Sequence, residues 1–392
     1  MTRKVVRDKR DLREVSVMLT DSDVYCIDIE TVDRGYPDTK LTGVGVGCEK
    51  DGMYAARYIP IAHKKGLQLP LELVMEVLVD GVNSSNKMAV FHNAKYDIKI
   101  LRLIARKLGL EQFDFRPDNV YCTMLASWFL DTENPHGLKE LGERYLDILM
   151  TELDEFCEFV RHPKTNDKVY LTDETDIDVM AEYGYDDVIV PLKLKNIFDP
   201  EIEKEGFEKP MYDLKMPEMF ELMDMEETGV FIDQKELDRV IETAPEMLEE
   251  VKKKIFELRP GGKEFNPNSP QQLAGVLFEE IGVNPIGEKG ASGHYSTKKD
   301  YLEKWAAQGY EICEKVIDYR QVSKLLGTFA KGIKNRLWKD GRLRTRYNQI
   351  IRTGRTSSRK PNLQNIPRPS NDRFNLRGLF VAPEGKKLMA AD

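Results

Sequence analysis

Asp28 and Glu30 are the first residues along this sequence whose types and spacing could do metal chemistry. They stand at alternate positions of the run VYCIDIE (residues 24–30), which predicts a β-strand, so both carboxylates are expected on one face of it. The residues around them are mostly apolar. Burying two carboxylates among apolar residues is unfavourable unless something cationic compensates them, although a lone pair of this kind seldom binds metal.

Two more acidic residues follow at positions where predicted helices would present them. Asp97 opens a predicted helix directly after a strand that ends at Asn93, and Asp187 stands on a later predicted helix. Tyr183 precedes Asp187 by four residues, so the phenol and the carboxylate share one helical face. Together these side chains form a set of oxygen ligands that suits the hard divalent cations Mg²⁺ and Mn²⁺.

A further carboxylate, Asp392, closes the strand-like run at residues 387–392. An apolar strand that ends in a carboxylate commonly presents a ligand for two-metal phosphoryl transfer. Upstream of it lies the basic segment TGRTSSRKPNLQNIP (residues 353–367). The sequence therefore predicts one complete metal site joined to half of another.

The elements that must position the first site alternate between strand and helix. Residue periodicity predicts strands at 24–30, 43–49, 53–61 and 87–93, and helices at 96–108, 123–130, 137–149 and 177–197. This order indicates an α/β domain with a mixed sheet. The alternating glycines Gly43, Gly45 and Gly47 match the spacing of the first two glycines of a dinucleotide-binding fingerprint. The third glycine of that fingerprint would have to stand at a different offset and a helix would have to follow, so a strand of small residues is favoured.

Beyond residue 210 the pattern is mainly helical. The proline- and acid-rich stretch 198–210 predicts a domain boundary. Helices are predicted at 216–229, 234–258, 269–282, 297–308 and 310–337, followed by strands with a glycine turn and a final strand–turn–strand segment. We therefore expect domains at residues 1–205, 206–340 and 341–392.

Composition excludes several classes of protein. With 41% hydrophobic and 32% charged residues, the 392-residue chain is ordinary for a globular protein of two or three domains, and it has neither a membrane-length apolar run nor an apolar signal peptide. Five scattered cysteines without a CxxC motif favour a reducing compartment, without disulfides or structural zinc. The net charge is −8, but residues 331–377 form a basic tract with fourteen lysines and arginines and only two acids. Such a tract either binds a polyanion or forms a solvated basic surface.

Three segments resemble a known enzyme family. DIET (28–31), NAKYD (93–97) and YGYDD (183–187) are similar to the three motifs of the DEDD-type proofreading 3′→5′ exonucleases, in the variant with a tyrosine in the third motif. The resemblance implies an α/β, RNase H-like domain with a mixed sheet flanked by helices. It also implies two ions, Mg²⁺ or Mn²⁺, held by Asp28, Glu30, Asp97 and Asp187.

The same resemblance assigns further roles in the first half. Tyr183, with Glu30, would orient the attacking water. Asn93, Lys95 and Tyr96 would line the groove for a frayed single-stranded DNA end, by amide contact, phosphate pairing and base stacking respectively. Core packing is the alternative role for Tyr96.

The basic segment 353–367 resembles the signature that precedes the first catalytic motif of family A (Pol I-like) DNA polymerases, and the similarity extends back to about residue 20. It implies a mainly helical thumb and a partial α+β palm that grip primer–template DNA. Arg355, Asn362 and Gln364 would donate to minor-groove acceptors, and Asn365 would also bind DNA. Arg359 and Lys360 would contact phosphates.

In that family Asp392 matches the first polymerase metal ligand, and the motif continues beyond it. We therefore expect excision by this chain, in a bacterial or phage-infected cytoplasm, with polymerisation only beside a C-terminal chain that supplies the fingers and the rest of the palm. One alternative is a self-standing single-strand exonuclease with a DNA-binding arm. Another is a DNA-binding assembly subunit whose acidic site is inactive.

Overall fold

The computed structural model describes residues 1–290 and 293–389, and the chain divides into two compact units. Unit 1 contains Met1–Thr228 and Tyr347–Ser357. Unit 2 contains Gly229–Arg346 and the residues from Ser358 onward. The segment 347–357, which includes the start of the basic signature, thus belongs to the same unit as the first acidic motifs.

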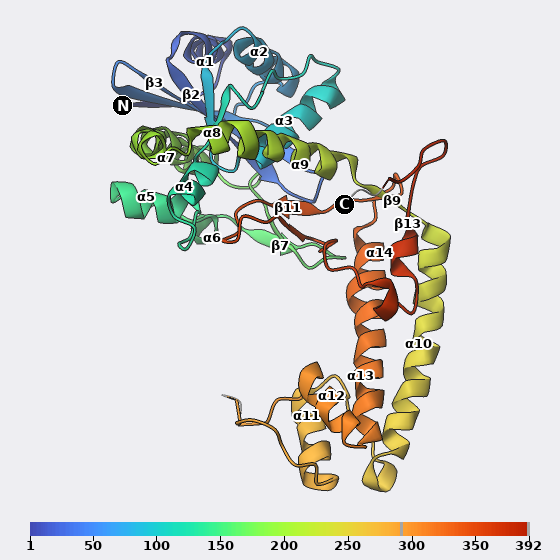
Figure 1. Ribbon diagram of the computed structural model, residues 1–392. Helices are drawn as coiled ribbons and strands as arrows, with labels where there is room; N and C mark the ends of the chain where they lie inside the picture. Colours follow the sequence, from blue (N-terminus) through green and yellow to red (C-terminus); the bar gives the residue numbers. More distant parts are fainter. Residues whose placement is uncertain (291–292, 390–392) are drawn as a thin grey trace. The chain divides into compact units, whose positions relative to one another are not determined.

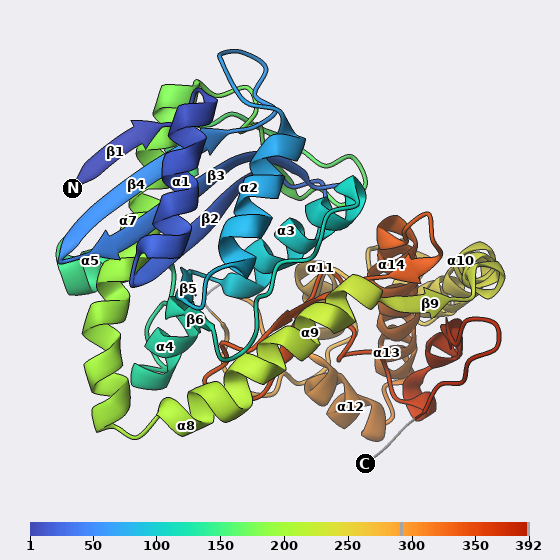
Figure 2. The same cartoon turned by 90° about the horizontal axis from the view of Figure 1, so that it is seen from above.

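Unit 1 is built on a six-stranded sheet (Figure 1), whose order β1-β4-β3-β2-β5-β6 can be followed in Figure 2. Its strands are β1 (Thr2–Val5), β2 (Val24–Val32), β3 (Lys40–Lys50), β4 (Met53–Pro60), β5 (Met88–Phe91) and β6 (Val120–Cys122). The pairs β2–β3 and β3–β4 are antiparallel, whereas β1–β4, β2–β5 and β5–β6 are parallel. The predicted α/β class with a mixed sheet is confirmed.

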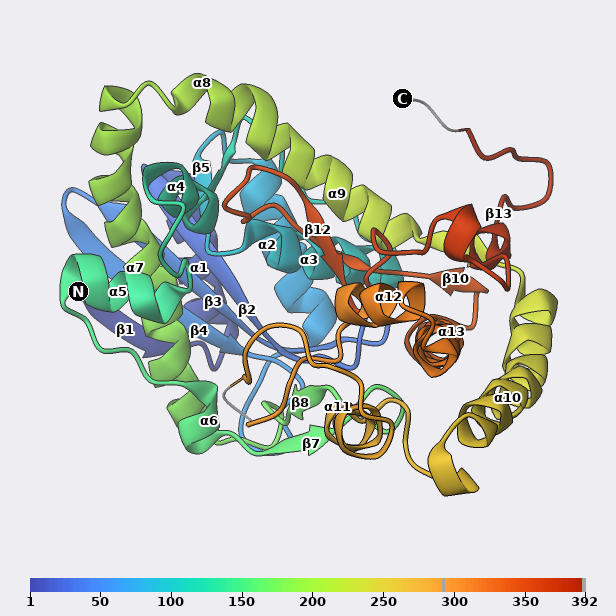
Figure 3. The same ribbon diagram turned by 60° about the horizontal axis from the view of Figure 1, so that its bottom comes forward.

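Helices cover both faces of this sheet. The helices of unit 1 are α1 (Lys9–Asp21), α2 (Leu71–Asn83), α3 (Ala94–Leu108), α4 (Thr123–Leu130), α5 (Leu138–Leu146), α6 (Leu153–Phe156), α7 (Ile177–Lys204), α8 (Glu208–Pro210) and α9 (Met216–Thr228), with a π-helical turn at Met211–Lys215 before α9. Figure 2 shows α1 and α2 over one face, and α7 lies across the other face (Figure 3). A short hairpin, β7 (Phe159–Arg161) and β8 (Lys168–Tyr170), precedes α7.

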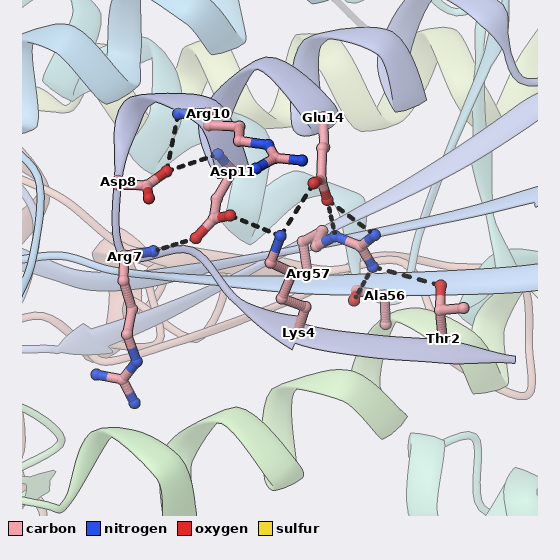
Figure 4. Close-up of polar contacts among 9 residues, drawn as sticks. All are labelled: Thr2, Lys4, Arg7, Asp8, Arg10, Asp11, Glu14, Ala56 and Arg57. Atoms are coloured by element: carbon pink, nitrogen blue, oxygen red, sulfur yellow. Dashed lines mark hydrogen bonds and ion pairs between the residues drawn. The ribbon is translucent and has the colours of Figure 1, made fainter.

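Ion pairs and hydrogen bonds connect the edge strand β1 with α1 and β4 (Figure 4). Lys4 Nζ lies 2.6 Å from Asp11 Oδ1 and 2.9 Å from Glu14 Oε1. Arg57 on β4 donates to the other oxygen of Glu14. The sequence did not predict β1, α1 or α2, and the pairing of β1 with β4 extends the sheet by one strand.

Unit 2 has two hydrophobic cores along a pair of long helices. The helices α10 (Gln234–Glu257) and α13 (Glu311–Lys324) pack side by side. One core lies where they meet the three-stranded sheet β10 (Arg342–Leu343), β9 (Val230–Ile232) and β13 (Phe380–Val381). The other core surrounds the fully buried Trp305.

The remaining elements of unit 2 are short. They are α11 (Pro270–Ala274), α12 (Lys299–Ala307) and α14 (Gly332–Arg336), with π-helical turns at Gly275–Glu280 and Leu325–Lys331 and 3₁₀ turns at Pro260–Gly262, Pro369–Asn371 and Leu376–Leu379. The strands β11 (Arg346–Asn348) and β12 (Ser357–Arg359), which belong partly to unit 1, pair with each other.

The stretch 198–210 is helical through Lys204, and the compact units divide after Thr228, where α9 ends before a left-handed Gly229. One detail differs from the sequence-based expectations. The final strand predicted for residues 387–392 is absent from its described part, 387–389, where no strand pairs with it and Met389 is 93% exposed. A strand without a hydrogen-bonded neighbour has no ladder to stabilise it.

The five cysteines are free and buried. A membrane-spanning helix is absent from residues 1–290 and 293–389, because none of their helices combines sufficient length with sufficient hydropathy.

Candidate active site

The site begins on β2, which has hydrogen-bonded neighbours on both sides. Asp28 lies opposite Gly45 of β3, and Glu30 lies opposite Gly43. Residues that face each other across an antiparallel pair point to the same side of the sheet, so the two carboxylates share a face with these glycines. Strand alternation therefore places both carboxylates on one side, as predicted from their spacing.

The glycines of β3 explain how α7 comes so close to these carboxylates. A Cβ added at Gly45 would lie 2.8 Å from Val188 Cγ1, and one added at Gly47 would lie 2.8 Å from the carbonyl oxygen of Val188. Larger residues at these positions would push α7 away from the sheet. The GVGVG run is thus a packing surface for the helix that carries Asp187, which the sequence alone did not reveal.

The other acidic side chains come from the starts and faces of helices. Tyr183 and Asp187 both lie on α7, which begins after Asp176, whose side chain caps the first turn. Asp97 lies in the first turn of α3. This helix begins directly after Asn93, which adopts a left-handed conformation with φ of 63°. Asp97 and Asp187 are only 3% and 7% exposed.

Three of the four predicted ligands meet within a small volume. Asp28, Glu30 and Asp187 each offer a carboxylate oxygen, and these three oxygens lie within 4.8 Å of one another. Asp97 stays outside this group but is close enough for its charge to raise the pKa of Asp28. An all-oxygen donor set of this size fits a hard divalent cation.

The charge of Lys139 offsets only part of the burial and mutual repulsion of these carboxyl groups. Burial is the main cause that raises the pKa of Asp28 and Glu30 well above the usual carboxyl range, and repulsion among the carboxylates adds to it. Burial also raises the pKa of Asp97 and of Asp187, although Lys139 opposes the increase at Asp187. Carboxyl groups held this way either take up protons or need a cation.

Two residues that the motifs do not include contact the third motif. Lys139 Nζ of α5 lies 2.9 Å from Asp187 Oδ1 and 4.2 Å from the centroid of the Tyr183 ring. The ring of Phe156, at the end of α6, lies 5.4 Å from that of Tyr183. Burial raises the pKa of Tyr183, so this phenol stays protonated at neutral pH.

The residues predicted to guide single-stranded DNA have different surroundings. Asn93 is exposed, whereas Tyr96 is half-buried against the core and its hydroxyl lies 2.7 Å from Thr31 Oγ1. Lys95 is 14% exposed, and its Nζ lies 2.5 Å from Glu226 Oε1. The DNA contacts assigned to these residues stay predictions.

Glu226 anchors a buried cluster that the sequence did not predict. Its second oxygen lies 2.5 Å from Lys99 Nζ, and its first accepts a 2.7 Å hydrogen bond from the Tyr347 backbone N–H. Lys95 also donates to the Tyr347 carbonyl. Burial acts to raise the pKa of Glu226, but the lysines outweigh it and hold that pKa below its usual value. The cluster ties α3, which carries Asp97, to the segment 347–357.

The predicted duplex-binding residues are mostly at the surface. Arg355, Arg359, Lys360, Asn362, Gln364 and Asn365 are exposed. Asn362 Oδ1 lies 3.1 Å from Ser358 Oγ, which organises the turn of the signature. Asn365 lines a cavity of about 330 Å³ in unit 2, together with Lys299, Arg320 and Lys324. Asp392 lies outside the described residues.

Comparison with known proteins agrees with this arrangement. Residues 4–203 match the sequence model of the 3′-5′ exonuclease family, and residues 234–392 match that of DNA polymerase family A. The chain is 29% identical over 381 residues to DNA polymerase I of Pseudomonas aeruginosa, covering 95% of this chain and 40% of that protein. It is 31% identical over 359 residues to the DNA polymerase of Escherichia phage T5, covering 85% of this chain and 41% of that protein.

A solved structure with the same fold is the POL domain of Pol1 from M. smegmatis in complex with DNA primer-template and dNTP, which superposes with a TM-score of 0.76 at 22% identity. The superposition covers 98% of this chain and 59% of that one. The chain spans about two fifths of the length of the two polymerases above. It belongs to the 3′-5′ exonuclease family, and its residues 234–392 are similar to DNA polymerase family A.

Proposed function

We propose that this chain removes nucleotides from the 3′ ends of DNA by metal-dependent hydrolysis, as the proofreading part of a family A DNA polymerase. The observation that carries the proposal is the meeting of Asp28, Glu30 and Asp187 within 4.8 Å. These carboxylates are buried or half-buried and come from a strand and a distant helix. Such a cluster is electrostatically unfavourable by itself, and a divalent cation would relieve it.

In this proposal Asp28, Glu30, Asp97 and Asp187 hold two divalent ions, Mg²⁺ or Mn²⁺. When bound, such ions supply activation of a water molecule and stabilisation of the leaving 3′ oxygen. The protonated Tyr183 phenol and Glu30 orient the attacking water. Asn93, Lys95 and Tyr96 guide the frayed end toward the cluster.

We propose that the remaining residues bind primer–template DNA. Residues 1–205 would form the exonuclease domain, 206–340 the thumb and 341–392 part of the palm. The exposed Arg355, Asn362 and Gln364 would donate to minor-groove acceptors. Exposed Arg359 and Lys360 would contact phosphates.

Nucleotide addition, in our proposal, needs a further polymerase segment, because the chain spans only about two fifths of the polymerases that it resembles. Those polymerases come from bacteria and a bacterial virus, which supports a role inside a bacterial or infected cell. The polymerase comparison also supports DNA as the substrate of excision.

The test is degradation of a 5′-labelled single strand in the presence of Mg²⁺. The double variant Asp28→Ala, Glu30→Ala is expected to lose 3′-end degradation while binding duplex DNA as the unchanged protein does. The matched control is Asp21→Ala, Asp23→Ala, which removes two exposed acids beside the start of β2. Persistent degradation by the first variant would contradict the metal assignment, and loss of degradation in the control would show that the effect is not specific.

A further inference from the structure

Lys139 brings an ammonium group to the carboxylate cluster, although it belongs to none of the exonuclease motifs. Its Nζ lies 2.9 Å from Asp187 Oδ1 and 4.2 Å from the centre of the Tyr183 ring. The side chain is 18% exposed. One cation thus contacts both the acid and the phenol of the third motif.

The packing of α5 fixes the position of this lysine. Leu138 and Leu141 on either side of it are buried, and a Cβ added at Gly142 would lie 3.5 Å from Val190 Cγ1 of α7. The helix that carries Lys139 is therefore seated against the helix that carries Asp187. A lysine held in this way is part of the built site and not a mobile surface side chain.

A cation at this position acts against a second cation in the same cluster. The ammonium group pairs with one carboxylate oxygen of Asp187, and its positive charge repels a divalent ion bound at this cluster at short range. Its contact with the Tyr183 ring is a cation–π interaction that holds the phenol beside the cluster. A phosphodiester is negatively charged, so its arrival would attract the ammonium group away from Asp187.

We propose that Lys139 is a positioning residue that couples metal binding to arrival of the DNA end. In the free protein it holds Asp187 and Tyr183 and weakens divalent-ion binding at Asp187. When a phosphodiester enters, Lys139 pairs with the phosphate and leaves Asp187 to the ion. This inference rests on the proposed exonuclease function.

The test measures Mn²⁺ binding to the full chain by the electron paramagnetic resonance signal of unbound Mn²⁺. In the absence of DNA, Lys139→Met is expected to bind Mn²⁺ about tenfold more tightly, because one short-range repulsion is gone. Lys139→Arg keeps the charge that repels the ion, so its Mn²⁺ affinity is expected to stay within about twofold of that of the unchanged protein. A single strand with a non-hydrolysable 3′ linkage is expected to tighten Mn²⁺ binding in the unchanged protein and much less in Lys139→Met.

Lys139→Gln, which keeps a hydrogen-bond donor without the charge, is the second variant in case the methionine disturbs folding, and its Mn²⁺ affinity is expected to rise as well. A merely structural lysine would give the opposite sign, since a loosened cluster binds Mn²⁺ more weakly. Unchanged or weaker Mn²⁺ binding in folded Lys139→Gln would overturn the inference. Asp28→Ala separates the two proposals: if it leaves Mn²⁺ binding intact, the metal site itself is wrong, whereas loss of binding there with unchanged affinity in Lys139→Gln refutes only the role of Lys139.

Discussion

Replacing Asp28 with asparagine is expected to stabilise unit 1 in the absence of divalent ions. Asparagine has nearly the same shape as aspartate, so the change removes a charge and leaves the packing intact. The carboxylate oxygens of Glu30 and Asp187 lie within 4.8 Å of that of Asp28. With an effective dielectric constant near 20, each such pair repels by at least about 3.5 kcal/mol.

Two effects reduce this repulsion in the unchanged protein. Lys139 attracts the charge of Asp28, and protonation of the cluster relieves part of the repulsion. We therefore expect a net stabilisation of about 2 kcal/mol at pH 8, which for a unit of this size raises the melting temperature by roughly 4–8 °C.

The pH dependence follows from the raised pKa of Asp28. A carboxyl group whose pKa is higher in the folded state than in the unfolded state contributes stability while it is protonated in the fold. That stability is present below the ordinary value of 3.8 and is lost as the pH rises from there through the raised value. The unchanged protein is thus expected to lose stability with rising pH in EDTA, and Asp28→Asn to lose less of it.

Differential scanning calorimetry at pH 6 and pH 8, in EDTA and in excess Mg²⁺, tests this reasoning. Mg²⁺ is expected to stabilise the unchanged protein, by about 2.7 kcal/mol at a hundred times its dissociation constant, and to stabilise Asp28→Asn much less. Asp23→Asn, at an exposed position just before β2, is the control and is expected to melt as the unchanged protein does. If Asp28→Asn melts at or below the unchanged protein in EDTA at pH 8, the account of the cluster as charge-strained is refuted.

Three further changes test other parts of the structure. Glu226→Gln leaves the buried Lys99 and the mostly buried Lys95 without their carboxylate, and it is expected to destabilise unit 1 by about 3 kcal/mol in urea unfolding. An unchanged midpoint would show that the cluster contributes nothing to stability. Gly47→Ala places a methyl group 2.8 Å from the Val188 carbonyl oxygen, so it is expected to lower the stability of unit 1 by about 2 kcal/mol and to weaken Mn²⁺ binding. Full stability in this variant would exclude the proposed packing role of the glycines. Arg355→Ala is expected to weaken primer–template binding about tenfold in fluorescence anisotropy. The slope of log affinity against log salt concentration is expected to change by less than about one, because a minor-groove donor releases few counterions. A large drop in that slope would instead show that Arg355 contacts a phosphate.

The parts of the fold that follow from local pattern were predictable. The alternation of Asp28 and Glu30 gave their common face, and the four-residue spacing of Tyr183 and Asp187 gave theirs. The predicted hairpin of β3 and β4 is confirmed by their antiparallel pairing. In each of these cases the information lies within a few residues of sequence.

What the sequence could not provide depends on contacts between distant segments. Lys139 lies 48 positions from Asp187, and Glu226 lies more than 120 positions from its two lysine partners. Charged residues on helices are usually solvated, so nothing in the local pattern distinguished these from surface residues. The signal for such a residue would be a buried charged side chain on a helix that packs against an acidic motif. Its burial and its neighbour become visible only in the folded structure, where the helices are packed.

The glycines of β3 and the acids of β2 are both unfavourable for local stability, and they lie opposite one another in the sheet. Glycine weakens a strand interior, and buried carboxylates oppose folding. Gly45 and Gly47 bring α7 against the sheet, and this approach delivers Asp187 to Asp28 and Glu30. The close approach that the glycines allow places a third carboxylate beside the two on the strand, where repulsion among the three opposes folding unless a cation is present. An arrangement that concentrates negative charge in this way is better explained by our proposed cation site than by selection for stability.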